Sequence, residues 1–263
     1  MLAIDVGNTR VKIGLFAGND CRGSYAIPVD ACGDLGPVRR WIWEAGADVD
    51  QPAAVSDVNP LVTRDLVRAW RDEFGVTPRP VGRPRRWLLD VDVEKPDRVG
   101  PDRLFNAVAA KAIRPAGVTT LIVDAGTAIT VDVVDAAGAF RGGAILPGFG
   151  LSAKALNAYT ASLPAVPSAD VASDTPTAIG RDTTAAIRSG LFWGAVGAVN
   201  ELIARQRSEL GVSDVDSEIV VTGGAGPRLV PYVAGARAEP YLALTGLVLT
   251  AADEAEHGEA ADL

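Results

Sequence analysis

Two stretches of the sequence resemble each other closely enough to decide the fold. They are LAIDVGNTRVKIGLFAGNDCRG (residues 2–23) and LIVDAGTAITVDVVDAAGAFRG (residues 121–142). Each has the pattern of a strand, a tight D-x-G turn and a second strand. At a constant offset of 119 residues they share six identities, which are Leu2/Leu121, Asp5/Asp124, Gly7/Gly126, Ala17/Ala136, Arg22/Arg141 and Gly23/Gly142. Because the apolar alternation also stays in phase, we interpret the chain as two copies of one fold.

The segments around the two copies alternate between strand and helix patterns. In the first half the pattern predicts strands at 24–27, 53–58 and 87–93 and helices at 35–43, 61–74 and 104–113. In the second half it predicts helices at 151–161, 177–210 and 241–252 and a strand at 218–222. This alternation is typical of an α/β layer fold.

The break at residues 114–117 separates the halves. We expect an N-terminal domain over residues 1–115, a C-terminal domain over 116–252 and a disordered acidic tail over 253–263. Within the long helix, Gly190, Gly194 and Gly197 permit close packing against another helix.

Composition excludes several classes of protein. The 263 residues carry a net charge of −8, which does not suit a general binder of nucleic acid or anionic membranes. The single histidine, His257, and the two cysteines exclude zinc sites made from His/Cys clusters. The start of the chain lacks the pattern of a signal peptide, and no apolar run reaches 18 residues, so we expect a cytoplasmic protein without a membrane span.

The turn DVGNTRVK, residues 5–12, has the residue types of a phosphate site. The backbone amides of its Gly-Asn-Thr turn, the Asn8 amide and the Thr9 hydroxyl can bind a phosphate group, and Lys12 adds a point charge. Asp5 is a candidate ligand for Mg²⁺, which prefers one or two carboxylates with phosphate oxygens. The alternative is an ordinary hairpin with an Asx turn.

Two further elements support the phosphate interpretation. DAGTAITVD (124–132) repeats the D-x-G turn, and VVTGGAG (220–226) places two glycines between a strand and a helix, where the backbone can approach a ligand closely. We expect the paired turns to bind one phosphate tail from both sides of a cleft. No P-loop motif G-x-x-x-x-G-K-[ST] is present in the sequence.

Together these features resemble the acetate and sugar kinase/chaperone/actin superfamily, and within it the chain is similar to the type III pantothenate kinases. The resemblance rests on eight blocks in order. They are DVGNTRVKIGLF, VGPDRLFNAVAA, DAGTAITVD, GGAILPGFGLSAKAL, ALNAYTASLP, IGRDTTAAIRSGLFWGAV, VVTGGAGPRL and LTGL. The resemblance implies an α/β fold of two tandem ribonuclease-H-like (actin-like ATPase) domains with a nucleotide cleft between them. It also implies ATP-dependent phosphorylation of pantothenate to 4′-phosphopantothenate in coenzyme A biosynthesis.

The resemblance also implies roles for individual residues. Asp102 is the implied base that accepts the proton of the substrate hydroxyl, and the neighbouring Arg103 is suited to pair with a carboxylate. The implied ATP-binding residues are Asp5, Val6, Gly7, Asn8, Thr9, Arg10, Val11, Lys12 and Thr127. The implied pantothenate-binding residues are Gly100, Pro101, Asp102, Arg103 and Thr183. Asp124 is expected at a monovalent cation (K⁺ or NH₄⁺), Asp5 at Mg²⁺, and Thr183 across the interface of a homodimer.

Several alternatives stay open at this stage. Asp102 and Thr183 are each also suited to cap a helix, and Asp132 is equally suited to face solvent. The family often has an aromatic residue where this chain has Val93, so the pocket is lined differently or Trp87 or Tyr159 supplies the ring. A kinase for another small hydroxy acid and a non-catalytic regulatory relative are therefore the alternative functions.

Overall fold

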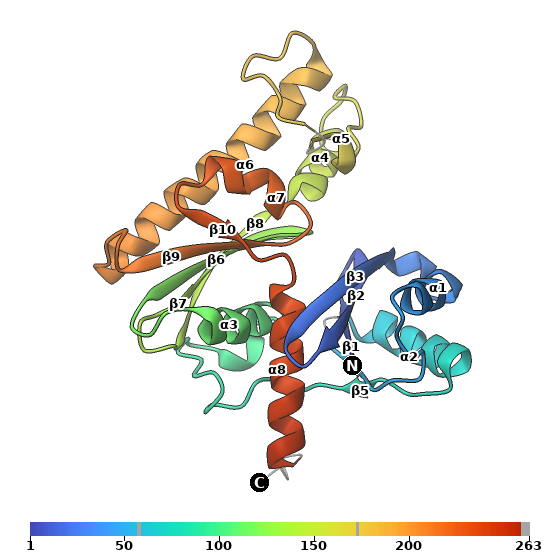
Figure 1. Cartoon of the computed structure of the whole chain (residues 1–263). Coiled ribbons are helices and arrows are strands. Elements are labelled where there is room, and N and C mark those ends of the chain that lie inside the picture. The colour runs from blue at the N-terminus through green and yellow to red at the C-terminus, as the bar shows by residue number, and fades with distance from the viewer. Residues whose placement is uncertain (57–58, 172–173, 259–263) are drawn as a thin grey trace. The chain divides into compact units, whose positions relative to one another are not determined.

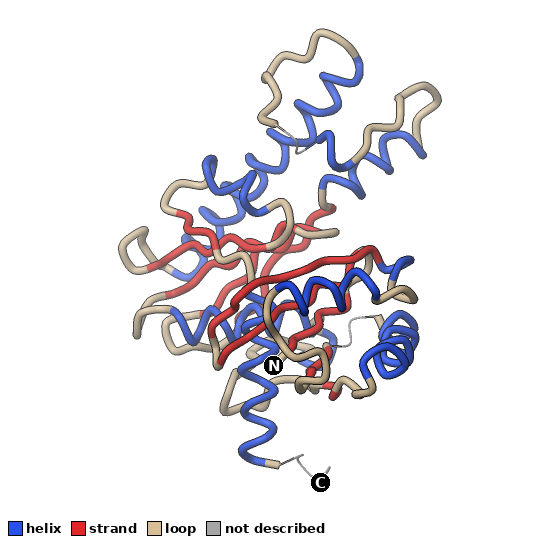
Figure 2. Tube along the Cα trace, turned by 45° about the vertical axis from the view of Figure 1, so that its right-hand side comes forward, coloured by secondary structure: helices blue, strands red, loops and turns tan. Residues whose placement is uncertain are grey.

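The computed structural model describes residues 1–56, 59–171 and 174–258 and contains two five-stranded sheets of identical topology (Figures 1 and 2). The first sheet has the order β3-β2-β1-β4-β5, from β1 (Leu2–Val6), β2 (Arg10–Ala17), β3 (Asp20–Pro28), β4 (Ala53–Val55) and β5 (Arg79–Pro80). The second has the order β8-β7-β6-β9-β10, from β6 (Thr119–Ala125), β7 (Ala128–Val134), β8 (Phe140–Pro147), β9 (Ser217–Thr222) and β10 (Ala236–Ala238). In both, three antiparallel strands are followed by two parallel ones, which confirms the predicted duplication.

The two hairpins differ by one residue at the turn. Val6 pairs with Val11 in the first hairpin, whereas Ala125 pairs with Ile129 in the second. The partner of Asp5 is therefore Lys12, and the partner of Asp124 is Thr130. The constant offset predicted from the sequence is thus wrong immediately after the turn, because the second turn is shorter.

The first sheet is covered by helices on both faces. One face packs on α1 (Gly36–Glu44) and α2 (Pro60–Phe74) through a cluster that includes Leu2, Ile4 and Trp70. The other face packs on α8 (Leu242–His257), whose Leu244 and Leu247 join Ala3 and Phe105. Because successive strand residues point to opposite faces, the continuous apolar run of β1 supplies both clusters.

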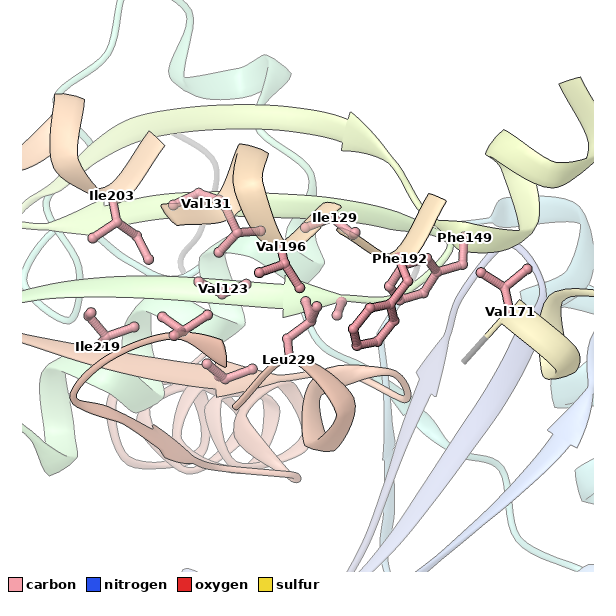
Figure 3. Close-up of a cluster of buried hydrophobic side chains, with 14 of the residues drawn as sticks. Val123, Ile129, Val131, Phe149, Val171, Phe192, Val196, Ile203, Ile219 and Leu229 are labelled. Carbon is pink, nitrogen blue, oxygen red and sulfur yellow. The ribbon is translucent and has the colours of Figure 1, made fainter. Parts of the chain in front are cut away.

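The second sheet packs on α6 (Thr183–Leu210), which carries Phe192, Val196, Val199 and Ile203 into the cluster shown in Figure 3. At 28 residues α6 is about 42 Å long, whereas β6, with seven, spans about 23 Å. The helix therefore extends beyond the sheet, where α4 (Phe149–Ala158) and α5 (Ser168–Val171) pack against it (Figure 1).

The contacts divide the chain differently from the predicted domains 1–115 and 116–252. Residues Met1–Ile113 and the segment from Tyr241 form one unit, and Arg114–Pro240 form the other. The reason is that the apolar face of α8 packs on the first sheet and on α3 (Pro101–Ile113). The predicted tail is also partly wrong, since α8 continues to His257; residues 259–263 lie outside the described part.

Two other predictions need correction. Residues 87–93 form no strand: a turn covers residues 86–88, with the amides of Leu88 and Leu89 both donating to the carbonyl of Arg85, and Val91 forms an isolated bridge. The predicted strand 53–58 ends at Val55, and its last two positions lie outside the described residues. The remaining short helices are η1 (Val29–Ala31), η2 (Pro96–Arg98), α7 (Gly226–Leu229) and η3 (Val230–Tyr232).

A search of the described residues finds no helix with the length and apolarity that crossing a membrane requires.

The close contact between α3 and α8 predicts that a single added methyl group at Gly246 strongly lowers the stability of the protein. A Cβ at Gly246 would lie 1.8 Å from the carbonyl oxygen of Phe105. We expect Gly246→Ala to lower the free energy of unfolding by about 2 kcal/mol or more, although alanine is the better helix former by about 1 kcal/mol. Urea unfolding measures this. Gly33→Ala, where a Cβ meets nothing within 4 Å, is the control and should stay within about 0.5 kcal/mol; equal effects of the two changes would refute the close contact.

Candidate functional site

The turn between β1 and β2 presents its polar residues at the end of the first sheet. The Gly7 amide donates to the Arg10 carbonyl (3.0 Å), and the Thr9 carbonyl accepts from the Val29 amide (3.1 Å). Asn8, Thr9 and Arg10 are exposed. Val6 and Val11, by contrast, are buried in the core, so their side chains hold the turn and only their backbone can face a ligand.

Asp5 lies just before this turn in a polar but enclosed position. Asp5 is only 6% exposed, and its Oδ1 accepts a hydrogen bond from the Ser56 hydroxyl (2.9 Å). The Ser56 oxygen in turn accepts from the Val6 amide (3.3 Å). Sequence reasoning missed Ser56, whose only signal was its position directly after β4. Lys12 is half-buried and opposite Asp5 in register, so the two side chains share a face of the sheet.

The second polar group of this unit is the start of α3. Asp102 lies in the first turn of the helix, after Pro101, and its Oδ1 accepts from the Arg103 amide (2.9 Å). A Cβ at Gly100 would lie 2.5 Å from the same oxygen, so the glycine is what allows this carboxylate position. The positive end of the helix favours negative charge here. Asp102 is thus the second residue of α3 and bonds the amide of the residue that follows it, whereas a capping residue precedes the helix and bonds an amide two or three residues further on.

In the other unit, three elements meet around the turn between β6 and β7. The Gly126 amide donates to the Ala128 carbonyl (2.9 Å), and the Thr127 carbonyl accepts from the Gly148 amide (3.1 Å), at the residue that caps α4. Thr127 itself is exposed. The start of α4 thus lies against the turn.

The Gly223-Gly224 turn after β9 completes this group. Gly223 has φ of +86°, and a Cβ there would lie 2.4 Å from Asp124 Oδ1 and 2.6 Å from the Ala125 carbonyl oxygen. A Cβ at Gly224 would meet nothing within 4 Å. Gly223 therefore permits the close approach of the backbone to Asp124. Gly224 leaves the backbone uncovered at the carboxyl ends of the strands, and ligands of open α/β sheets bind at such ends.

The donors present fit the cations that the sequence predicts. Asp124 is a half-buried carboxylate beside a glycine cradle, and hard cations prefer oxygen donors of this kind. Asp5 offers a single carboxylate, which matches the preference of Mg²⁺ for few protein ligands together with phosphate oxygens.

Thr183 and Asp132 are the next two residues that the sequence analysis considered. Thr183 is the exposed first residue of α6, and the helix is capped by Asp182, whose side chain accepts from the Ala185 amide (2.8 Å). Capping thus does not account for Thr183. Asp132 is fully buried in β7, so the solvent-facing alternative is wrong.

Trp87 and Val93 belong to the first unit, and Tyr159 belongs to the second. Val93 lies in a loop and is half-buried. The indole of Trp87 donates to Asp253 Oδ1 (2.9 Å) on α8, and Tyr159 follows α4 and is 89% exposed.

Comparison with known proteins gives consistent matches. A sequence profile described as type III pantothenate kinase matches residues 1–205. A protein named type III pantothenate kinase from Rhodospirillum centenum is 37% identical over 233 residues, which cover 85% of this chain and 87% of that one. Proteins of the same name from Rubrobacter xylanophilus and Sphingopyxis alaskensis are 36% and 35% identical over 94% of this chain, with 95% and 96% of their own lengths covered.

Solved structures share the fold at lower identity. A Campylobacter jejuni protein described as a Baf family transcriptional activator has a TM-score of 0.59 at 18% identity, covering 97% of this chain and 100% of its own. The activator of 2-hydroxyisocaproyl-CoA dehydratase from Clostridium difficile, with bound ADPNP, has a TM-score of 0.52 at 14% identity over 100% and 99% of the two chains. These likenesses concern the fold alone, and they confirm the predicted two-domain α/β fold.

The two glycines after β9 form a matched pair for a test. Gly223→Ala places a methyl group against Asp124 and the backbone at a positive φ, whereas Gly224→Ala adds one in open space. We expect Gly223→Ala to destabilise the protein by about 2 kcal/mol and Gly224→Ala to stay within about 0.5 kcal/mol, measured by urea unfolding. A larger effect of Gly224→Ala would contradict the placement of Asp124 against Gly223.

Proposed function

This chain belongs to the type III pantothenate kinase family, and we propose on that premise that it transfers the γ-phosphoryl group of ATP to the hydroxyl of pantothenate with Asp102 as the base. The product is 4′-phosphopantothenate, and the reaction is the first step of coenzyme A biosynthesis. The observation that carries the proposal is the Gly100–Arg103 segment, where a glycine allows the Asp102 carboxylate to lie at the start of α3.

The chemistry follows from what phosphoryl transfer requires. The attacking hydroxyl needs a carboxylate that accepts its proton, and the phosphates need donors that stabilise charge. In the proposal Asp102 takes the proton, while Arg103 pairs with the carboxylate of pantothenate. Gly100 and Pro101 shape this segment for the substrate.

The two turns bind the nucleotide in this proposal. Gly7, Asn8, Thr9 and Arg10 supply backbone and side-chain donors, and Lys12 supplies positive charge. Thr127, in the turn between β6 and β7, contacts ATP in the same proposal. Asp5 would hold Mg²⁺ and Asp124 a monovalent cation, and these ions neutralise phosphate charge when bound. An acidic chain needs such local groups, because its net charge of −8 repels both anionic substrates.

Neither alternative function gains support. The three relatives compared above are all named type III pantothenate kinases. The Baf family likeness, at 18% identity, concerns the fold and not a regulatory role.

Asp102→Asn tests the proposed base. We expect the variant to bind ATP normally and to lose turnover by about 10²-fold or more, because an amide cannot accept the proton. A coupled ADP-release assay with pantothenate, K⁺ and Mg²⁺ measures turnover. Asp97→Asn, an exposed carboxylate a few residues earlier, is the control and should keep the normal rate. A near-normal rate in Asp102→Asn would remove Asp102 from this role, and no turnover in the unchanged protein would refute the proposed activity.

We also propose that the protein acts as a homodimer through α6. Gly190, Gly194 and Gly197 lie on an exposed face of this helix, and a Cβ at each would meet nothing within 4 Å in the described structure. Each glycine costs an exposed helix about 1 kcal/mol relative to alanine. Close packing against a second copy explains why three occur on one face, and it would carry the exposed Thr183 to the partner's substrate.

Gly194→Arg tests the dimer. We expect this variant to be a monomer by light scattering and to lose pantothenate turnover, because the arginine blocks close approach of the helices. Glu209→Arg, at an exposed position in the last turn of α6 and 15 residues beyond Gly194, should remain dimeric. A strict monomer in the unchanged protein would contradict both the dimer and the role of Thr183 in trans.

A further inference from the structure

One arginine of the loop before α3 binds the backbone that leads to Asp102. The guanidinium of Arg83 donates from Nη1 to the carbonyls of Val99 (2.9 Å) and Asp97 (3.5 Å) and from Nη2 to the carbonyl of Pro96. These carbonyls belong to η2 and the residue after it, directly before Gly100. A single planar cation thus joins three acceptors in four consecutive residues.

This contact matters because the backbone hydrogen bonds within the segment are local. Residues 92–99 lie in no strand, and the amides of Arg98 and Val99 donate to the carbonyls of Lys95 (3.0 Å) and Pro96 (3.1 Å). Guanidinium groups hold several acceptors in fixed directions, which a single ammonium cannot do. Arg83 therefore sets the direction in which the chain enters α3.

Arg83 is itself held in place by the end of α8. The preceding residue, Gly82, donates its amide to Glu254 Oε1 (2.8 Å), and Arg79 donates to Glu254 Oε2 (2.6 Å) and to the Ala251 carbonyl (2.8 Å). The Glu254 side chain is only 13% exposed. The acidic end of the chain, which composition alone marks as a solvated tail, thus anchors the loop that carries Arg83.

From this geometry we propose that Arg83 is a positioning residue for phosphoryl transfer: it holds residues 96–99 so that Asp102 and Arg103 face the acceptor substrate. The proposal rests on the proposed function of the Gly100–Arg103 segment. It assigns to Arg83 no contact with substrate. Small displacements of a catalytic group cost large factors in rate, so a residue outside the site can control it.

The experiment compares Arg83→Met with Arg86→Met. Arg86 is the matched control, since its side chain is 88% exposed and pairs with Asp90, four residues away. We expect Arg83→Met to lower kcat/KM for pantothenate about tenfold while the KM for ATP changes less than twofold and Tm is unchanged. Arg83→Lys, which retains one donor group, should have a kcat/KM for pantothenate between those of Arg83→Met and the unchanged protein. Arg86→Met should match the unchanged protein.

Hydrogen exchange provides a readout that does not depend on activity. In Arg83→Met the amides of Arg103 and Leu104, at the start of α3, should exchange faster than in the unchanged protein and in Arg86→Met. Faster exchange with the expected kinetic change supports the proposal. An unchanged kcat/KM, unchanged exchange, or a joint loss of Tm and of affinity for ATP would overturn it. If the unchanged protein does not phosphorylate pantothenate, the proposed function fails, and the exchange data still show whether Arg83 holds the segment.

Discussion

The close contact between α3 and α8 is the constraint on which the first unit depends. Gly246 lies so near the backbone of Phe105 that no side chain fits between the helices. The same α8 covers the face of the first sheet that includes Ala3, and α3 begins with the segment of Asp102. One helix pair therefore connects the turn at Asp5, the start of α3 and the C-terminal end of the chain.

Duplication supplies two similar turns, but their surroundings give them different chemistry. Asp5 is almost enclosed and already accepts a hydrogen bond from Ser56, whereas Asp124 is more open and lies against the backbone of Gly223. The Asp5 carboxylate is thus oriented by a hydroxyl group, whereas the Asp124 carboxylate packs closely on a backbone turn that only glycine permits. The repeated D-x-G pattern is thus compatible with unequal roles in nucleotide and cation binding.

Local patterns in the sequence predicted most of the elements and the duplication, because strand alternation and helix periodicity depend on neighbouring residues. They did not predict the contribution of Ser56, the two-residue strand β5 or the packing of α8 on the first sheet. Each of these depends on partners far away in the chain. Residues 87–93 were mistaken for a strand for the same reason: the indole of Trp87 donates to Asp253 on α8, far along the chain.

In the candidate site, too, some features could be predicted from the sequence, whereas others depend on partners that it does not reveal. The family resemblance of Gly100–Arg103 implied the chemistry. The position of the carboxylate, by contrast, depends on the missing Cβ at Gly100, and the path of the preceding backbone depends on Arg83. No pattern in the sequence singled out the arginines of residues 79–86, because their acceptors are carbonyl groups and an acidic helix end that composition does not reveal.

Transfer of labelled phosphate tests the central claim most directly. The protein is incubated with ATP labelled at the γ-phosphate, Mg²⁺, K⁺ and an equimolar mixture of pantothenate and other small hydroxy acids, and the labelled products are separated and identified. The account predicts that the label appears in 4′-phosphopantothenate. Label in a different hydroxy acid, or in inorganic phosphate alone, would contradict it.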